Sequence, residues 1–506
     1  MKVFSCFSIL EIITTVFFWS FRLVSSQQDC VSYGVHISLG DYFQRYVSQN
    51  NEYLVDDTSK NVLLRINYLT NNQCPLTYVS INSLNLTPTT TTNFQGSSLS
   101  NTSKFSVYIQ SVSVTTDLGL PLNTDTYYTI HSNGTATDVS KTFRFRIPDR
   151  EADSHTLIVV GVMDANSSDS NVTFNALQGL SDQPNINLID AVLYTGNMAY
   201  NLETNDFNNG VNFLNKMQVF AAYWPFMPTA GDVDSYGNFS FYHEVFSSIN
   251  DNQFKNNFFS FNLGKAHFIQ INMAYFFGSI ITTDERNLIT SWLTEDLSNA
   301  NSSSNRQARP WIIIYGYHSF YCSLPNDIFC HTYENSSITN FSAIFNMFET
   351  IFEEYAVDLY ISSASQSIYE RLPPILFDQA KQYSSLISPD VNQLYMVNPA
   401  ATVYLIEGVG GNANTSENKF DEKMGFTLVQ AKNPGYGILT IINGTHLKYD
   451  HVSNVTSDSD TFYLINTKQK WPLIWEYTDK RTFAMSFVFF VVIGGFMLII
   501  FMFYLE

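Results

Sequence analysis

Short apolar runs alternate with helical segments through the middle of this chain, and no other feature constrains the fold as strongly. Helical periodicity occurs at 213–222, 284–300 and 341–355. The apolar runs lie at 157–160, 191–194, 268–271, 311–315 and 357–361. Buried strands that alternate with helices predict an α/β core whose functional residues lie in loops at the strand ends. The loops after residues 160, 194, 228, 315 and 361 are therefore where we expect any chemistry.

The segment from Val35 to Pro148 has a different pattern, in which short β-rich runs are separated by clusters of Asn, Thr, Ser and Gly. This spacing predicts a small antiparallel sandwich that serves packing or recognition. Its expected strands are 62–68, 78–86, 104–115, 126–131 and 142–147. A final β-rich stretch, 402–406 with 437–452, is expected to close the core.

The N-terminus has the features of a secretory signal. Lys2 precedes an apolar stretch at 3–24, and small residues stand just before Gln27. A membrane-spanning signal anchor is the alternative, but Glu11 and Arg22 interrupt the apolar run. We therefore expect residues 1–26 to be removed.

The C-terminus predicts a membrane span. Residues 483–504 form an uninterrupted apolar run of the ~20 residues that a helix needs to cross a bilayer. Trp471, Trp475 and Tyr477 precede it at a spacing typical of an interfacial aromatic belt. Two basic residues before the run oppose the orientation that a cleaved signal would set, and we expect the signal to decide. A lipid anchor is less favoured because no small-residue triplet lies upstream. The prediction is a single-pass membrane protein of the secretory pathway with a lumenal or extracellular ectodomain.

Cysteines and glycosylation motifs agree with such a compartment. Loss of the signal would leave four cysteines, and we favour the pairs Cys30–Cys74 and Cys322–Cys330 because each lies within one local region. Four cysteines nevertheless allow three connectivities. Recurrent acceptor motifs predict N-glycosylation along the ectodomain. The acceptors are Asn85, Asn101, Asn133, Asn166, Asn171, Asn238, Asn301, Asn335, Asn340, Asn414, Asn443 and Asn454.

Charge argues against a nucleic-acid partner. The chain has 506 residues, 45% of them hydrophobic, which is enough for two or three domains with real cores. Its net charge is −19 and its 26 Lys and Arg residues form no clustered basic run. The electrostatic footprint that binds a polyanion is therefore missing from the sequence.

Several segments match blocks of one known family. They are 309–316 (RPWIIIYG), 321–323 (YCS), 357–359 (VDL), 369–371 (YER), 291–297 (SWLTEDL), 261–267, 435–437 (GYG), 443–447 (NGTHL) and 143–148 (FRFRIP). Together they resemble the purple acid phosphatases, which are calcineurin-like metallophosphoesterases, over nearly the whole ectodomain. The resemblance implies a fibronectin-III-like all-β domain at 27–150 and a metallophosphoesterase-like α/β domain, a β-sandwich flanked by helices, at 151–455. A juxtamembrane linker at 456–482 and the span at 483–504 would follow.

The resemblance also implies a dimetal centre of Fe with Zn, Mn or Fe, held by residues from the five loops and bridged by a carboxylate. This chain departs from the pattern in every loop. Among the ligand positions only Tyr200 is unchanged, while Asp232 stands in place of an amide ligand. The other positions of the degenerate site are Val162, Asn197 in place of the bridging carboxylate, Val233, Tyr317, Ser365 and Ser367. An amide does not bridge two cations as a carboxylate does, and serine binds first-row metals poorly beside imidazole.

Other acids in the same loops offer an alternative. A single Ca²⁺ or Mg²⁺ bound by Asp164, Tyr200, Asp232, Asp234 and His318 would restore a metal. We favour instead solvated loop acids and a surface histidine, because Asp is common in loops and a one-residue shift usually redirects a side chain. His267 and His446 are expected to be structural.

The sequence therefore predicts a membrane-anchored glycoprotein that is a catalytically inactive member of the phosphatase fold, with no cofactor expected and a recognition or structural role. No Gly-x-Ser-x-Gly, phosphate-binding glycine loop or His-Glu-x-x-His motif supports other enzyme chemistry. The alternative function is a divergent metal-dependent acid phosphatase that uses displaced oxygen ligands. Binding of an anionic ligand without cleavage is a third hypothesis, and the five loops carry no Lys or Arg to favour it.

Overall fold

The structure is a computed structural model. It describes residues 31–41, 43, 48–49, 52–53, 61–70, 77–82, 84–97, 104–132, 142–183, 188–199, 202–203, 207–246, 254–277, 281–322, 339–363, 368–374, 394–411 and 427–467. The predicted signal and the predicted span at 483–504 lie outside these residues. Within the described part of the chain, no helix is long and apolar enough to cross a membrane.

The N-terminal region forms two four-stranded antiparallel sheets and a separate small β2–β3 ladder (Ser48–Gln49, Glu52–Tyr53). The first sheet has the order β1 (Ser32–Leu39), β4 (Val62–Thr70), β8 (Lys104–Thr115), β7 (Thr90–Ser97). The second has the order β10 (Thr142–Phe145), β9 (Thr126–Ser132), β5 (Thr77–Ile81), β6 (Leu84–Leu86). The expected run 78–86 is in fact a hairpin, since Asn82 adopts a φ of 54° between β5 and β6.

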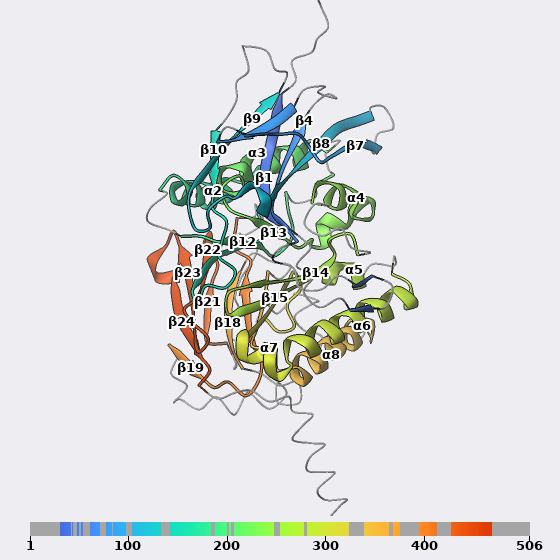
Figure 1. The fold of residues 1–506 in the computed structure, drawn as a ribbon. Helices are drawn as coiled ribbons and strands as arrows, with labels where there is room; N and C mark the ends of the chain where they lie inside the picture. The colour runs from blue at the N-terminus through green and yellow to red at the C-terminus, as the bar shows by residue number, and fades with distance from the viewer. Residues whose placement is uncertain are drawn as a thin grey trace, which may run out of the picture.

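The described residues of the α/β core form two seven-stranded sheets (Figure 1). In order, the first contains β13 (Phe226–Pro228), β12 (Ala191–Tyr194), β11 (His155–Val160), β22 (Gly435–Ile441), β23 (His446–Ser453), β24 (Asp460–Ile465) and β19 (Tyr395–Val397). The second contains β14 (Phe258–Leu263), β15 (Ala266–Ile271), β16 (Trp311–Gly316), β17 (Leu359–Ser362), β20 (Val403–Glu407), β18 (Tyr369–Pro374) and β21 (Val429–Ala431). Strands β11, β12 and β13 are parallel, as are β15, β16, β17 and β20. The α/β core predicted from the sequence is confirmed.

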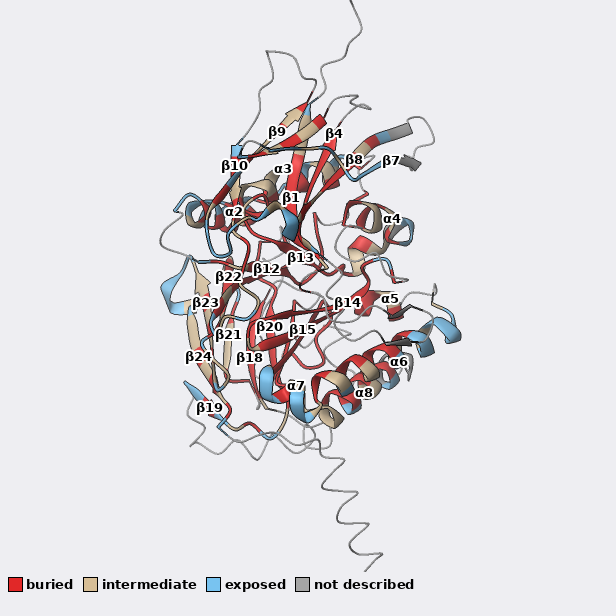
Figure 2. Ribbon diagram, in the orientation of Figure 1, coloured by how far each residue is buried: buried red, intermediate tan, exposed pale blue. Residues whose placement is uncertain are grey.

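Sequence pattern explains both the strands and the helices. β11 and β16 read as near-continuous apolar runs because their side chains are buried on both faces, and Figure 2 shows β14, β15 and β20 equally covered. The helices are α2 (Ser168–Ser181), α3 (Asn208–Ala221), α4 (Tyr236–Val245), α5 (Met273–Phe277), α6 (Thr283–Ala300), α7 (Ser303–Ala308) and α8 (Thr339–Glu354). α6 starts at a capping box of Thr282 and Glu285. It packs with α8 against the second core sheet through a shared apolar cluster.

The N-terminal sheets are docked onto helix α3 of the core. The backbone N–H groups of Gly34 and Val35 donate to the side chains of Asn215 and Gln218 at 3.1 and 2.9 Å. The phenol of Tyr128, on β9, donates to the carbonyl at the end of α3 at 2.6 Å. Both sheets and the core share one buried apolar cluster, so the two regions form a continuous interior.

The first core sheet extends beyond the expected boundary at 455. β24 pairs with β23 over 460–465, and Phe462 and Leu464 are buried on its inner face. A polar turn that contains the short 3-10 helix Thr456–Asp458 precedes β24 and has the composition of a linker. The domain therefore continues at least to Ile465.

Burial also bears on the glycosylation and disulfide predictions. Asn301 follows α6 and is only 6% exposed, which argues against a glycan at this position. The side chains of Asn85, Asn166, Asn171, Asn238 and Asn454 are exposed and that of Asn443 is half-buried. Those of Asn101, Asn133, Asn335, Asn340 and Asn414 lie outside the described residues. Cys322 is disulfide-bonded, and the other cysteines, Cys30, Cys74 and Cys330 among them, lie outside the described residues.

Candidate functional site

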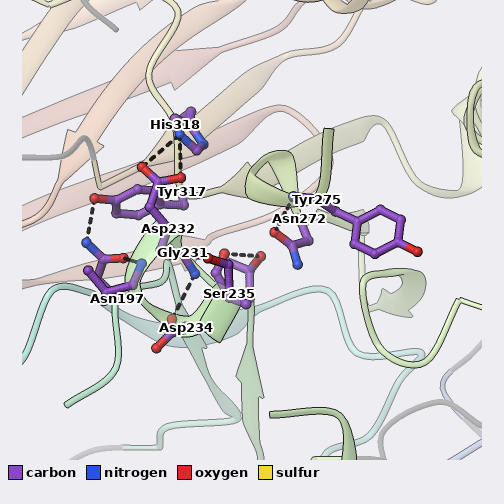
Figure 3. A network of polar contacts seen from close by, with 12 residues as sticks. Asn197, Gly231, Asp232, Asp234, Ser235, Asn272, Tyr275, Tyr317 and His318 are labelled. Atoms are coloured by element: carbon purple, nitrogen blue, oxygen red, sulfur yellow. Dashed lines mark hydrogen bonds and ion pairs between the residues drawn. The ribbon is translucent and has the colours of Figure 1, made fainter. Parts of the chain in front are cut away.

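The loops that follow β11, β12, β13, β16 and β17 meet where the two core sheets adjoin, as the sequence predicts. Figure 3 shows residues from the loops after β12, β13 and β16. The backbone N–H of Val162 donates to the carbonyl of Gly196 at 2.9 Å, which joins the first two loops. The N–H of Ser363 donates to the carbonyl of Tyr317 at 3.0 Å, which joins the last two. Parallel strands of adjacent sheets thus deliver their loops to one place.

Asn197 lies at the centre of this convergence. Its side chain is 6% exposed and its φ of 54° is one that Asn tolerates better than most residues. The amide nitrogen donates to the phenolic oxygen of Tyr317 at 2.5 Å, and the amide oxygen accepts from the N–H of Val233 at 3.2 Å. Both ends of the amide are therefore engaged by neighbouring loops.

Tyr317 fills the space in front of Asn197. Its side chain is 1% exposed, and its ring packs so closely on Gly196 that a Cβ there would lie 2.9 Å from ring and Cβ atoms of Tyr317. Gly231 makes a similar approach, since a Cβ there would lie 2.2 Å from the amide oxygen of Asn197. The lack of a side chain at Gly196 and Gly231 thus lets Tyr317 and Asn197 pack against the backbone where the loops converge.

Asp234 is a buried acid that holds two loops together. One carboxylate oxygen accepts from the N–H of Gly231 at 2.8 Å. Both oxygens accept from the N–H of Met198, at 3.0 and 3.2 Å. Burial raises the pKa of Asp234 to about 7, while the backbone N–H groups lower it and the charge of Asp232 raises it further. The expectation that Asp234 is a solvated loop acid is wrong. Its carboxylate is buried and serves as the hydrogen-bond acceptor for the backbone N–H groups of two loops.

Asp232 and His318 are in contact across the third and fourth loops, with His318 Nε2 at hydrogen-bonding distances of 3.0 and 3.1 Å from the two carboxylate oxygens. The side chain of Asp232 is 34% exposed, whereas that of His318 is 1% exposed. The expectation that His318 lies at the surface is therefore also wrong. The one-residue displacement turns Tyr317 toward Asn197 and His318 toward Asp232, so both remain at the site (Figure 3).

The first loop contributes packing. Val162 is buried with a φ of 56°, a conformation that is uncommon for a β-branched residue, and Met163 forms an isolated bridge with Met198. Asp164 is half-buried, and its carboxylate accepts from the N–H of Asn166 at 2.9 Å in an Asx-type turn. A turn-forming carboxylate of this kind has a local structural role.

Three predicted site residues, Tyr200, Ser365 and Ser367, lie outside the described residues. Ser363, which the sequence did not single out, is present at the site instead. Its hydroxyl donates to the carbonyl of Thr195 at 2.9 Å and contacts the Thr195 hydroxyl. Both hydroxyls face Gly161, where a Cβ would collide with them. Hydroxyl residues next to a strand-end glycine give no recognisable sequence signal for this contact.

The Tyr-Glu-Arg segment at the fifth loop turns away from the centre into the space between the two core sheets. The Tyr369 phenol donates to Asp460 at 2.7 Å, and Arg371 donates to the same carboxylate at 2.7 and 3.2 Å. His451 stacks on Tyr369 with ring centroids 4.0 Å apart, and its Nδ1 lies 3.0 Å from Glu407. These residues join β18 and β20 to β23 and β24, so their role is structural.

The two other histidines considered from the sequence are structural as predicted. His267 is buried, with its ring nitrogens 2.8 Å from Asn262 and from Asp296. His446 is half-buried beside Thr445, at 2.8 Å. Neither side chain contacts the converging loops in the described part of the chain.

A pair of bridged metal ions does not fit the donors at this site. The nitrogen of Asn197 faces Tyr317, the carboxylate of Asp234 accepts backbone N–H groups, and Asp232 is paired with His318. Within the described ranges, no group of three His, Cys, Asp or Glu side chains is placed to hold a metal ion. The donors are neutral, or are already bound to one another.

Comparison with known proteins finds relatives in the purple acid phosphatase family. A family model described as iron/zinc purple acid phosphatase-like protein C matches residues 401–462. Acid phosphatase type 7 of Homo sapiens is 30% identical over 335 residues, which cover 65% of this chain and 71% of that protein. Acid phosphatase type 7 of Mus musculus is 33% identical over 276 residues, 54% of this chain and 59% of that protein. The purple acid phosphatase structure from yellow lupin seeds superposes with a TM-score of 0.61 at 14% identity, over 86% of this chain and 74% of that chain.

Proposed function

Because the chain belongs to the purple acid phosphatase family, we propose that it is a pseudophosphatase, a member that keeps the fold and serves recognition or structure without hydrolysing phosphate esters. The family requires two metal ions that lower the pKa of a bound water and bind the phosphoryl oxygens. One observation carries the proposal. Asn197 stands in place of the bridging carboxylate, and its amide nitrogen is bound to the phenol of Tyr317.

The packing of Tyr317 supports the same proposal. A water or phosphoryl oxygen between two metals would need open space at the junction of the second and fourth loops. Tyr317 is 1% exposed and packs directly on Gly196 there. The substitution therefore both removes a ligand and occupies the volume in which substrate would react.

We further propose the setting in which the protein works. The two N-terminal sheets correspond to a fibronectin-III-like domain, and the span at 483–504 anchors a glycosylated ectodomain in a membrane of the secretory pathway. Exposed acceptors such as Asn166, Asn171 and Asn238 support the glycosylation. A disulfide between Cys322 and Cys330 would close a short local loop.

Metal analysis and a phosphomonoester assay on the full-length, detergent-solubilised protein test the pseudophosphatase proposal. We expect less than one equivalent of Fe, Zn or Mn per chain. We also expect the same low turnover from the wild type and an Asp232→Asn variant purified in parallel. Equal residual activity in the two preparations would identify a contaminating phosphatase.

The divergent-phosphatase alternative has one observation in its favour, the Asp232–His318 pair at the mouth of the site. It predicts bound metal and a turnover that Asp232→Asn abolishes while the circular dichroism spectrum stays unchanged. Two equivalents of metal with such a loss would refute the pseudophosphatase proposal.

A further inference from the structure

The outer face of β19 and β24 carries an exposed apolar patch. Tyr395 and Val397 are 43% and 56% exposed, and they pair in parallel register with Tyr463 and Ile465, which are half-buried. Register partners project to the same face of a sheet, and the rings of Tyr395 and Tyr463 stack with centroids 5.3 Å apart. We call these four residues the β19 patch.

The patch differs from an ordinary solvent-facing sheet surface. Residues of β19 and β24 that alternate with it, Met396, Phe462 and Leu464, are buried in the core. A strand with one covered face normally carries polar residues on the other. Here both faces are apolar at this corner, while the same outer face of β23 carries Lys448 paired with Asp450 at 2.8 Å. The apolar character is therefore confined to β19 and β24.

The position of the patch indicates what covers it. Ile465, one of its members, ends β24, and the described chain ends two residues later. Only residues 468–482 separate this point from the predicted span. Fully extended they would reach about 50 Å, and as a flexible chain roughly 20 Å. The tether therefore holds the β19 patch near the bilayer surface.

We propose that the β19 patch rests on the membrane interface, with the tyrosine rings among the lipid headgroups and Val397 and Ile465 directed to the acyl boundary. Amphipathic rings favour this depth because one end is apolar and the other hydrogen-bonds to water or headgroups. The inference rests on the proposed membrane anchor and adds an orientation to it. β19 and the N-terminal sheets lie at opposite ends of the molecule, so the N-terminal sheets are held away from the membrane (Figure 1).

Spin labelling of the full-length chain in phosphatidylcholine nanodiscs tests the orientation. A nitroxide is attached at Val397→Cys, and relaxation is measured with a paramagnetic nickel chelate carried on lipid headgroups. The matched control is Tyr127→Cys on β9, because Tyr127 is 57% exposed and lies in the N-terminal sheets. Unsubstituted protein taken through the same labelling gives the background from native cysteines. We expect the nickel lipid to enhance relaxation several-fold more at position 397 than at position 127.

Equal enhancement at the two positions, in chains retained by the bilayer, would overturn the orientation and leave the anchor intact. Retention is measured separately, by flotation of the chain with vesicles after alkaline extraction. Failure to float would refute the anchor, and the orientation would fall with it. Greater enhancement at 127 than at 397 would reverse the proposed orientation.

Discussion

The amide nitrogen of Asn197 donates a 2.5 Å hydrogen bond to the phenolic oxygen of Tyr317, and this contact joins the loops after β12 and β16. The resemblance to the family implies that the two residues stand at two different ligand positions. They complement each other, since the amide supplies a donor and the phenol an acceptor that also fills space. The two side chains are thus structurally coupled.

Tyr317→Phe is expected to destabilise the fold. The change removes the acceptor for a buried amide N–H of Asn197, and such an orphaned donor costs about 1–3 kcal/mol. Chemical denaturation of the full-length protein in detergent measures the loss. The exposed Tyr127→Phe change is the control and should stay within about 0.5 kcal/mol of wild type. Equal stability of Tyr317→Phe and wild type would show that the contact contributes nothing.

Asp234→Asn should change how stability depends on pH. The folded-state pKa of Asp234 is about 7, against an ordinary value of 3.8, so the folded state binds this proton more tightly than the unfolded state does. The stability that the carboxyl contributes is therefore fully present below pH 3.8 and is lost as the pH rises toward 7. Asn does not titrate, so the wild type should lose stability relative to the variant by up to about 1.4 kcal/mol per pH unit across this window.

Urea denaturation at several pH values measures that slope. The constant offset between Asp234→Asn and wild type is not diagnostic, because the amide also exchanges an acceptor for a donor. Tyr127→Phe, which alters no carboxyl group, should run parallel to wild type. A difference between Asp234→Asn and wild type that stays constant with pH would contradict the raised pKa.

Asp460→Ala should destabilise the protein by about 3–5 kcal/mol, because it removes a carboxylate from the buried guanidinium of Arg371. Arg371 is 1% exposed and makes two bonds to Asp460. Asp153 pairs with Lys265 at 3.1 Å but is 72% exposed, so Asp153→Ala should cost less than about 1 kcal/mol. Thermal unfolding of both variants gives the comparison. Similar small losses would mean that Asp460 does not secure Arg371.

Two glycine-to-alanine substitutions should change the stability of the fold in opposite directions. A Cβ at Gly437 on β22 would lie 1.9 Å from the phenolic oxygen of Tyr449 on the neighbouring strand β23, so Gly437→Ala would displace the buried Tyr449 side chain and should cost about 1–3 kcal/mol. Gly179 lies in α2 with nothing within 4 Å of its added Cβ. Gly179→Ala should stabilise by up to about 1 kcal/mol through helix propensity. Differential scanning calorimetry would contradict the packing argument if both changes shifted the melting temperature upward.

Glycan occupancy should follow burial. Asn301 is 6% exposed beside the end of α6, whereas Asn166, Asn171 and Asn238 are exposed. Enzymatic deglycosylation in heavy-oxygen water marks each occupied Asn by mass. The mark is expected at the three exposed positions and absent from Asn301. A mark at Asn301 would require the end of α6 to be rearranged.

Much of the fold follows from local sequence. Continuous apolar runs predict β11, β12, β15, β16 and β17, and apolar periodicity predicts α3, α6 and α8. Helix α2 is missed although its buried residues Thr173, Phe174, Leu177 and Ser181 recur at helical spacing. β24 is missed because it follows a turn of Asn, Ser and Asp that reads as a linker.

The sequence predicts which family ligands are replaced at the site, but it says less about the contacts that the replacing residues make. The resemblance to the family implies that Asn197, Val162 and Tyr317 stand at ligand positions, but the sequence gives no sign that Tyr317 packs on Gly196 or that Asp234 is buried. Both facts depend on the direction in which a side chain leaves its loop. Such directions are set by contacts between loops that lie far apart in the sequence.

The strand order of the first core sheet has a consequence for biosynthesis. β11 pairs on one side with β12, which follows closely, and on the other with β22, which is translated only after nearly the whole remaining domain. During synthesis, one edge of β11, the first strand of the core, therefore stays unpaired until β22 has been translated. Long-range pairing of this kind slows folding and leaves time for wrong partners to add to that edge. Maturation should accordingly depend on chaperones that shield nascent β-structure.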